Sequence, residues 1–453
     1  MATCTQHDVE TNLSCRTCGT PVCPDCAVRT AMGVSCAAHA GGEKKEAAVA
    51  LAPKAERSSG GRQRLLIGGV VLALLVGAVI LLRPGGGGDS TGGGVWTALP
   101  DAGLVPRSDF SSVTTGRSLI VWGGNSPSGP LGDGAIFDTA TSEWKPLAAA
   151  PIAPRRGHSA VWTGTQMIVF GGLTRGDGCR PNCALNDGAA YDPATDKWTP
   201  IPTAPIPGRN GHSGVYFQNR MVVWGGAIEG GGPSADGASY DPATNAWTML
   251  PPAPLAPRVA FRTVATTHRM LVWGGSNGGG QTGKYFDDGA IYSPADNSWS
   301  PMAAFPQTNE SAGRDTFSSV WTGEKMLVWG GYIRNTTCNP CGREDGAAYD
   351  LGSNSWTLMS PSPIAGRGAH RAVWTGREMV VWGGFTTTEV NDGARYNPES
   401  DTWVPLSASP LDVRQGPGMV WAGERIVLWG GVAPGARGGN PYFNDGAMLK
   451  LGS

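Results

Sequence analysis

The sequence predicts a mainly β protein whose larger part is a seven-bladed β-propeller, preceded by a small metal-binding segment and one membrane-spanning helix. Three observations support this prediction. A Gly-Gly pair that directly follows Trp or Phe recurs seven times at intervals of 47 to 56 residues, six of the ten Cys lie before residue 40, and an uninterrupted apolar run covers residues 65–82. With 69 Gly and only 16% charged residues, the composition suits a turn-rich β protein. The formal net charge of -1 provides no general attraction to nucleic acid, so no nucleic-acid partner is expected.

Residues 1–42 are expected to form a zinc-binding domain. The ligand-type residues form four pairs, each with two intervening residues: Cys4 with His7, Cys15 with Cys18, Cys23 with Cys26, and Cys36 with His39. This spacing lets a tight turn direct two side chains at one ion, and two pairs complete a tetrahedral zinc site. So short a segment has too small an apolar core to fold alone, so zinc would supply its folding free energy. A disulfide cluster is the alternative, which a reducing cytoplasm disfavours.

The order of these pairs resembles that of the B-box zinc finger, over about 36 residues. The resemblance implies that the first and third pairs share one ion and that the second and fourth share the other. One site would be Cys4, His7, Cys23 and Cys26, and the other Cys15, Cys18, Cys36 and His39. No ligand position is vacant, so both zinc ions would be structural. Such a domain would dock a cytoplasmic protein.

Residues 65–82 are expected to form a transmembrane helix. Eighteen residues at about 1.5 Å each extend roughly 27 Å, enough for a thin bilayer core. Six Lys and Arg lie in the expected cytoplasmic linker, residues 43–64, and only Arg83 follows the run closely. The positive-inside rule therefore predicts a single-pass plasma-membrane protein with a cytoplasmic N-terminus. A cleaved signal peptide is the alternative, but 64 residues precede the run and no small-residue cleavage site follows it. The Gly-rich residues 83–94 would be a flexible tether.

Residues 95–453 contain seven repeats with common features. Each has an Arg sixteen residues before the first Gly of Gly-Gly, and an Asp-Gly pair farther on. In the first six repeats a Trp follows eleven residues after that Asp. The local pattern predicts two apolar strands, A and B, joined by a tight turn, then strands C and D joined by a turn that often begins with Asp-Pro. The seven Arg are Arg107, Arg155, Arg209, Arg258, Arg314, Arg367 and Arg414, and the seven Asp are Asp133, Asp187, Asp236, Asp288, Asp345, Asp392 and Asp445.

Arg, Gly-Gly, Tyr or Phe, and Trp in this order closely resemble kelch repeats, over about residues 95 to 451. The resemblance implies that each repeat is a four-stranded antiparallel blade and that seven blades pack radially. The last repeat stops before its strand D, whereas the segment VWTALP around Trp96 matches a strand D. The N-terminal strand is therefore expected to complete the last blade and close the ring.

The residues that recur in every repeat are interpreted as scaffold. The seven Arg could form a basic ring that holds an anion. However, strand A, which follows the Arg, and strand C, which the Asp opens, start on the same face, so seven Arg–Asp pairs that tie the two strands together are favoured. The 17 Trp could stack on sugars, yet all occupy repeat positions, which indicates inter-blade core. His158, His212 and His370 share a position that other repeats fill with Phe or Pro, which indicates packing rather than metal ligation. A copper site would need a further cluster of His that the sequence lacks.

The four remaining Cys lie in two connections between strands B and C. Outside the membrane, Cys179–Cys183 and Cys338–Cys341 are expected to be disulfides. A redox-active Cys-Asn-Pro-Cys motif is one alternative. A metal ion shared by both loops is another, but the second and fifth blades are not neighbours.

Connection lengths vary on one face of the predicted propeller. This loop face carries the B–C and D–A connections, and the opposite turn face carries the A–B and C–D turns. The interval from Trp to Arg across the D–A connection rises from 11 to 15 residues in one case, and the interval across the B–C connection ranges from 8 to 15. Variable loops on a rigid scaffold are typical of recognition sites. A protein or glycan is expected to bind to the loop face near Gln307, Asn309, Glu310 and Arg314.

We therefore expect a binding protein and not an enzyme. No nucleophile–base pair, phosphate-binding loop or open metal site stands out from the repeats. A membrane-tethered enzyme of the epimerase or oxidase type and a structural component of the cell envelope are the alternatives, because a fold alone does not determine function.

Overall fold

The structure is a computed structural model that describes residues 93–176, 179–306, 312–333, 341–433 and 442–452, and four short strands nearer the N-terminus. The chain divides into two compact units, Met1–Pro84 and Gly85–Ser453. In the first unit, β1 (Ala2–Thr3) pairs with β2 (Glu10–Thr11), and β3 (Ala27–Thr30) pairs with β4 (Gly33–Cys36), both antiparallel. Of the expected zinc ligands only the backbone of Cys36 is described, at the end of β4. The other seven, and residues 65–82, lie outside the described residues.

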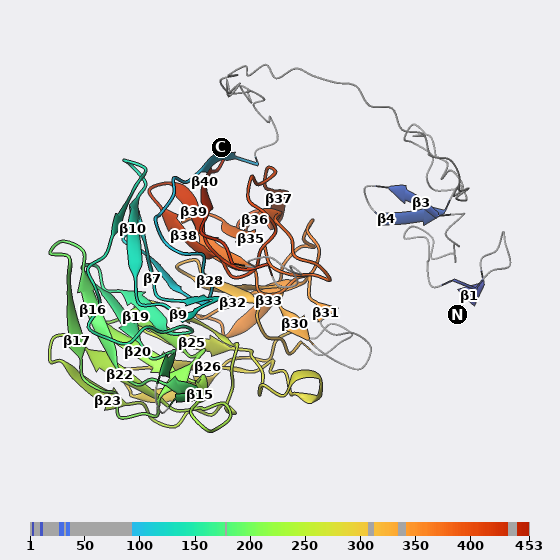
Figure 1. The fold of residues 1–453 in the computed structure, drawn as a ribbon. Helices are drawn as coiled ribbons and strands as arrows, with labels where there is room; N and C mark the ends of the chain where they lie inside the picture. Colours follow the sequence, from blue (N-terminus) through green and yellow to red (C-terminus); the bar gives the residue numbers. More distant parts are fainter. Residues whose placement is uncertain are drawn as a thin grey trace, which may run out of the picture. The chain divides into compact units, whose positions relative to one another are not determined.

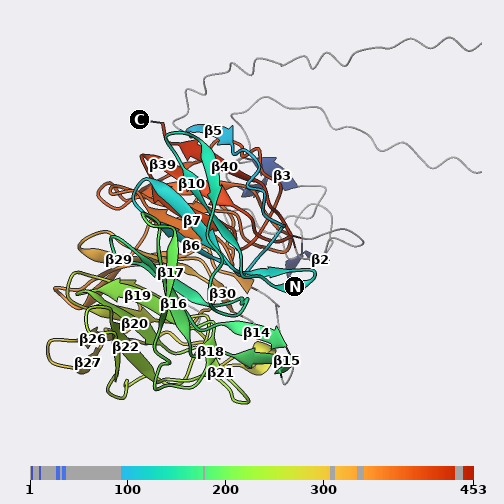
Figure 2. The same ribbon diagram turned by 60° about the vertical axis from the view of Figure 1, so that its left-hand side comes forward.

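The second unit contains seven four-stranded antiparallel sheets that follow one another around a central channel (Figures 1 and 2). Strand A is innermost in each, and strand order from the channel outward follows the chain in the first six blades. The first blade consists of β6 (Ser111–Thr114), β7 (Ser118–Trp122), β10 (Gly134–Asp138) and β11 (Glu143–Pro146). The second consists of β12 (Ser159–Trp162), β13 (Met167–Phe170), β16 (Gly188–Asp192) and β17 (Lys197–Ile201).

The next four blades repeat this arrangement. The third consists of β19 (Ser213–Phe217), β20 (Arg220–Trp224), β22 (Gly237–Asp241) and β23 (Ala246–Met249). The fourth consists of β24 (Arg262–Ala265), β25 (Met270–Trp273), β26 (Gly289–Ser293) and β27 (Ser298–Pro301). The fifth consists of β28 (Ser318–Trp321), β29 (Lys325–Trp329), β32 (Gly346–Asp350) and β33 (Ser355–Leu358). The sixth consists of β34 (Arg371–Trp374), β35 (Met379–Trp382), β36 (Gly393–Asn397) and β37 (Thr402–Pro405).

The seventh blade joins the two ends of the propeller. Its strands are β38 (Gly418–Ala422), β39 (Arg425–Trp429), β40 (Gly446–Lys450) and, outermost, β5 (Val95–Ala98). β5 pairs antiparallel with β40, and Trp96 lies opposite Leu449. Figure 2 shows β5 and the C-terminus side by side. The predicted closure of the ring by the N-terminal strand is therefore confirmed.

Short strands and one 3₁₀ helix lie in the connections on the loop face. Four two-stranded ladders involve the B–C connections: β8 (Asn125–Ser126) with β9 (Gly129–Pro130), β14 (Leu173–Gly176) with β15 (Cys179–Ala184), β18 (Arg209–Asn210) with β21 (Ala227–Ile228), and β30 (Tyr332–Ile333) with β31 (Cys341–Gly342). The 3₁₀ helix η1 spans Gly280–Thr282. Among the residues that the structure describes, no helix is long and apolar enough to cross a membrane.

Tryptophans hold neighbouring blades together, as the sequence predicted. The aromatic residue before Gly-Gly is buried in every blade, and the strand-D Trp of the next blade packs on it. Trp198 lies 5.4 Å from Trp122 between ring centroids, and Trp144 lies 5.8 Å from Trp429 across the closure. Each strand-D indole also donates its Nε1–H to a carbonyl that follows strand D of the preceding blade, as Trp198 does to Ala148 at 2.9 Å. Each inter-blade contact thus combines apolar burial with a satisfied polar atom.

The Gly-Gly pair is required by close contacts between blades. Gly123 and Gly124 have φ of +70° and +105°, a region that favours glycine. A Cβ on Gly123 would lie 2.7 Å from the His158 ring, and one on Gly124 would lie 2.7 Å from the carbonyl oxygen of Ser108. A side chain on Gly123 would push the next blade away, and one on Gly124 would displace the segment that leads into strand A of its own blade.

Candidate functional site

The seven repeat arginines are fully buried ties within their blades. Arg155 donates from Nε to the Ala153 carbonyl (2.9 Å), from Nη1 to the Gly171 carbonyl (3.1 Å), and forms an ion pair with Asp187 (2.8 Å). The same set recurs in all seven blades. The interpretation as Arg–Asp ties is therefore confirmed. It also corrects one expectation: Arg314 is 0% exposed and paired with Asp345, so it does not present its charge to a ligand on the loop face.

The three repeat histidines connect adjacent blades. His158 Nε2 lies 2.9 Å from Ser111 Oγ of the preceding blade, and its ring packs edge-on against Trp122. The pairs His212–Ser159 and His370–Ser318 repeat this geometry, and Phe261 packs in the same way against Trp224. Burial lowers the pKa of His158 and of His212 to about 3, so both rings are neutral near pH 7. The interpretation as packing residues therefore agrees with the structure.

These Ser–His pairs lack two features of a catalytic site. A catalytic base is normally oriented by a third group, yet Nδ1 of each ring has no hydrogen-bond partner within the described part of the chain. His212 and His370 are 8% and 1% exposed, so little surface is open to a substrate. Among the described residues, no group of three His, Cys, Asp or Glu could hold a metal ion.

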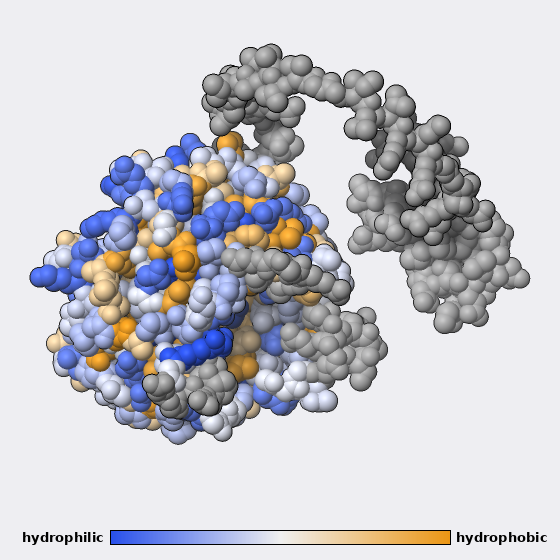
Figure 3. All heavy atoms as spheres, in the orientation of Figure 1, coloured by the Kyte–Doolittle hydropathy of each residue, from blue (hydrophilic) through white to orange (hydrophobic). Residues whose placement is uncertain are grey.

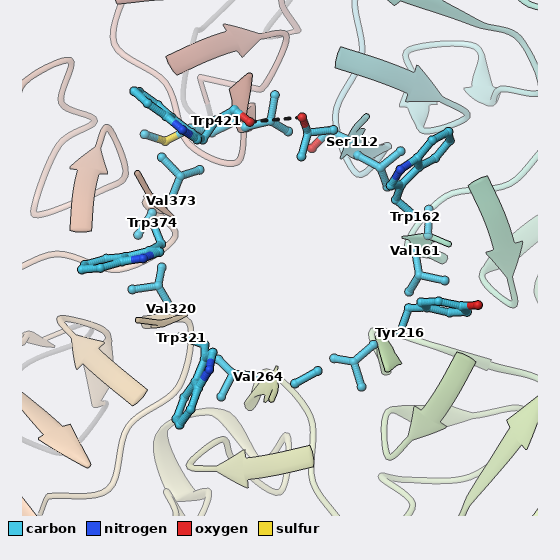
Figure 4. Close-up of a pocket in the computed structure, with 18 of the residues that line it drawn as sticks. Ser112, Val161, Trp162, Tyr216, Val264, Val320, Trp321, Val373, Trp374 and Trp421 are labelled. Atoms are coloured by element: carbon cyan, nitrogen blue, oxygen red, sulfur yellow. Dashed lines mark hydrogen bonds between the residues drawn. The ribbon is translucent and has the colours of Figure 1, made fainter. Parts of the chain in front are cut away.

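The central channel is lined by the seven A strands, each of which lies beside the A strand of the next blade. Figure 4 looks along this channel, a cavity of about 590 Å³. Each blade contributes one Val to the wall, and in five blades the next residue of strand A, also in the wall, is aromatic. The aromatic rings point outward between neighbouring blades (Figure 4). They are Trp162, Tyr216, Trp321, Trp374 and Trp421, whereas Thr114 and Ala265 occupy the same position in the first and fourth blades.

At its loop-face end the channel is surrounded by seven residues in the left-handed backbone region, which we call the mouth ring. Their φ values lie between 52° and 62°. Backbone hydrogen bonds connect neighbours around the ring, as from Gly157 N to Asp109 O (3.0 Å) and from Ala369 N to Thr316 O (2.9 Å). Four members are not glycine, and such backbone strain is found at functional sites. The seven residues are Asp109, Gly157, Gly211, Ala260, Thr316, Ala369 and Gly416.

Two arginines beside the mouth ring break the repeat. The first residue of strand A is Ser in four blades and Gly in the seventh, but Arg262 and Arg371 in the fourth and sixth. Arg262 Nη1 donates to the Phe261 carbonyl (3.1 Å), and Arg371 Nε donates to the Pro417 carbonyl (3.0 Å). Unlike the seven repeat arginines, neither forms an ion pair with a carboxylate of the described residues.

The electrostatic environment of these two arginines is cationic. The pKa of Arg262 is lowered to about 10, mainly by burial and also by the charge of Arg371, although Asp315 acts in the opposite direction. Burial also lowers the pKa of Arg371, against the effect of Asp109. Burial disfavours the charged form of both guanidinium groups, and neither is in an ion pair with a described carboxylate. A bound anion would supply that missing charge partner and stabilise both charges. The sequence signal for this pair is the replacement of Ser by Arg at one repeat position, the first residue of strand A.

The remaining predicted site residues lie in loops that the structure describes in part. Gln307, Asn309 and Glu310 are outside the described residues. Cys183 and Cys341 are each disulfide-bonded. Their partners are not among the described side chains, so the pairs Cys179–Cys183 and Cys338–Cys341 remain predictions.

On the face of the propeller that Figure 3 shows, the surface is mostly polar. In Figure 3, hydrophilic side chains predominate and apolar residues form small separate areas. The large exposed apolar residues of the described chain are scattered, with Val95 at one end and Met249 and Leu358 on different blades. Recognition by a broad apolar interface is therefore not indicated for this part of the protein.

Comparison with known families agrees with the repeat geometry. A family model described as the KLHDC2/KLHL20/DRC7 Kelch-repeats domain matches residues 93–207 and 200–358. The matched region extends from β5 to the end of β33, through the fifth blade. No curated protein sequence matches the chain.

Proposed function

The chain belongs to the KLHDC2/KLHL20/DRC7 kelch-repeat family, and from this premise we propose that its propeller is a protein-binding module that recognises an acidic segment at the loop-face mouth of the channel. The observation that supports this proposal is the pair Arg262 and Arg371. They are the two guanidinium groups of the A strands that break the repeat, and both lie near the channel mouth without a carboxylate partner among the described residues.

An acidic side chain would interact with this pair in a specific way. A carboxylate or phosphate can accept two parallel N–H bonds from one guanidinium group, and such charge-assisted bonds are about twice as strong as neutral ones. The partly buried position reduces screening by salt and water. The mouth ring holds the surrounding backbone in one conformation, so little entropy would be lost on binding.

We propose binding without catalysis, and a membrane-tethered arrangement for the whole protein. Residues 65–82 would cross the plasma membrane once, with the propeller outside and residues 1–42 in the cytoplasm. The support is the distribution of Lys and Arg around the apolar run. The cytoplasmic segment would hold two structural zinc ions through its four ligand pairs and dock a second protein.

Selection of peptides on the full-length protein tests the binding proposal. A random peptide library should yield segments rich in Asp and Glu. Their affinity should fall as the salt concentration rises from about 0.05 to about 0.5 M, because salt shortens the distance over which charges attract. The double substitution Arg262→Gln, Arg371→Gln should weaken binding of these peptides by at least about 100-fold, since each charge-assisted bond contributes about 1.5–3 kcal/mol.

Arg117→Gln is the matched control. Arg117 is exposed on the turn face and pairs with Asp138 at 2.7 Å, so its loss changes net charge by the same sign far from the mouth. Peptides without acidic bias, or equal losses from Arg117→Gln and from either mouth substitution, would contradict the proposal.

A further inference from the structure

Two grooves lie between blades on the turn face, opposite the proposed protein site. One, of about 510 Å³, lies between the fourth and fifth blades, and the other, of about 770 Å³, between the fifth and sixth. The A–B turn of the fifth blade, with Gly323 and Glu324, lines both. The two grooves therefore adjoin across a single turn, and both volumes fall within the range of about 300–1,000 Å³ typical of small-ligand sites.

Each groove has an indole ring in its wall. Trp321 lines the first groove, Trp374 lines the second, and both also line the channel. The seven strand-D tryptophans all donate their Nε1–H to carbonyls. By contrast, Nε1 of Trp321 and of Trp374 has no partner among the described residues and is not buried. These two indoles therefore border the grooves with an apolar ring, and each carries an N–H donor that no described residue occupies.

Charged groups of both signs surround the indoles. Glu324 and Glu399 are exposed, as are Arg269 and Arg377, and none of the four forms an ion pair within the described part of the chain. Carboxylates accept hydrogen bonds and guanidinium groups donate them. The walls can therefore satisfy a ligand that carries many hydroxyl groups and that offers both donors and acceptors.

We propose that the paired grooves bind a carbohydrate chain, with one sugar ring beside Trp321 and another beside Trp374. A pyranose ring has an apolar C–H face, which can pack on an indole, and an edge of hydroxyl groups, which can bond to carboxylates and guanidinium groups. Glu324, on the shared turn, accepts hydroxyl hydrogens from both rings. A peptide would instead need deep apolar pockets for its side chains, and each groove offers one aromatic residue among mostly polar ones.

The residues that other blades of this chain carry at the same repeat position indicate which substitutions the fold tolerates. Ala265 occupies the position of Trp321 and Trp374 in the fourth blade, so Trp374→Ala is compatible with the blade fold. Trp162→Ala makes the same change in the second blade, away from both grooves, and is the matched control. Glu324→Gln removes the shared carboxylate from an exposed turn while its shape is kept.

Binding is measured on the full-length protein by saturation-transfer NMR and by quenching of Trp fluorescence. The probes are the tetrasaccharides of N-acetylglucosamine, of α-1,4-glucose and of alternating uronic acid and amino sugar. At least one should bind, and Trp374→Ala and Glu324→Gln should each weaken it by about tenfold or more. Trp162→Ala and the double substitution of Arg262 and Arg371 should have no effect.

Three results would overturn the assignment: no binding of any of the three sugars at millimolar concentration, an equal loss caused by Trp162→Ala, or displacement of the sugar by an acidic peptide that binds at the mouth ring. The last result would place both ligands at one site. Because the arginine substitutions affect only the loop face, failure of the sugar site and failure of the protein site are distinguishable.

Discussion

Replacing Arg258 by Met should lower the stability of the propeller more than replacing its ion-pair partner Asp288 by Asn. Arg258 is 0% exposed, and its guanidinium donates to the carbonyls of Ala256 and Gly274, each at 3.0 Å. It also pairs with Asp288 at 2.8 Å, yet the Asp288 side chain is 51% exposed. Removing the Arg258 side chain thus leaves buried carbonyls without a donor, whereas the Asp288 side chain is already half exposed to water.

The expected magnitudes follow from that difference. Without Arg258, two buried carbonyls lose their donor, at about 1–3 kcal/mol each, so a total loss of about 2–6 kcal/mol is expected. Asp288→Asn keeps an amide oxygen as acceptor, and water already reaches this side chain, so about 1 kcal/mol is expected.

Thermal unfolding followed by tryptophan fluorescence measures both effects. All 17 Trp lie at or beyond Trp96, so this signal reports the propeller and not the N-terminal unit. An unfolding entropy of about 2.1 cal/mol/K per residue over roughly 360 residues gives about 0.75 kcal/mol/K. Arg258→Met should then lower Tm by about 3–8 °C, and Asp288→Asn by about 1–2 °C. Equal shifts, or a larger shift for Asp288→Asn, would refute this account of the ties.

Three further predictions address other parts of the chain. Deleting residues 95–100 should expose the edge of β40, lower Tm sharply and promote aggregation, and an unchanged Tm would count against closure by β5. The folded pKa of His212, about 3, lies below the unfolded value of about 6.5, so the unfolded state binds more protons in that window and stability is lost as pH falls below 6.5, by up to about 1.4 kcal/mol per pH unit. Urea unfolding at pH 7 and pH 5 should show a smaller loss for His212→Phe than for the unsubstituted protein, and an identical loss would refute a neutral buried His212. Metal analysis of the full chain should give two zinc ions, and Cys23→Ser should reduce that number; a count of one or none in the unsubstituted protein would reject the paired sites.

The propeller could be predicted from the sequence because its stabilising contacts recur at fixed spacing. Arg107 and Asp133 stand at the same repeat positions as six other pairs, so a tie could be inferred without knowing any distance. Counting strand-D tryptophans predicted that Trp96 completes the last blade. The Gly-Gly pair also has a local cause, because each glycine meets an atom of a neighbouring segment.

The candidate sites could not be predicted in the same way. Arg262 and Arg371 are more than a hundred residues apart and belong to blades that are not adjacent, so their influence on each other depends on the closed ring. Arg314 was expected near a ligand on the loop face because it follows the longest D–A connection, whereas its repeat position places it in the interior. The grooves arise between turns of neighbouring blades, and each turn by itself is ordinary.

A ligand without sevenfold symmetry can be recognised only where the blades differ. Residues that recur seven times, such as the buried arginines, already satisfy one another and leave no free group for a ligand. Positions at which one blade departs from the others are therefore where recognition chemistry can arise. At the start of strand A this departure is from Ser to Arg, in two blades. At the aromatic position it is the absence of a ring in the first and fourth blades, at Thr114 and Ala265. Ser213→Arg introduces a third arginine at the same strand position as Arg262. This variant should bind acidic peptides more tightly and leave sugar binding unchanged. Weaker binding of acidic peptides by that variant, with Tm unchanged, would show that charge at this strand position does not control recognition at the mouth ring.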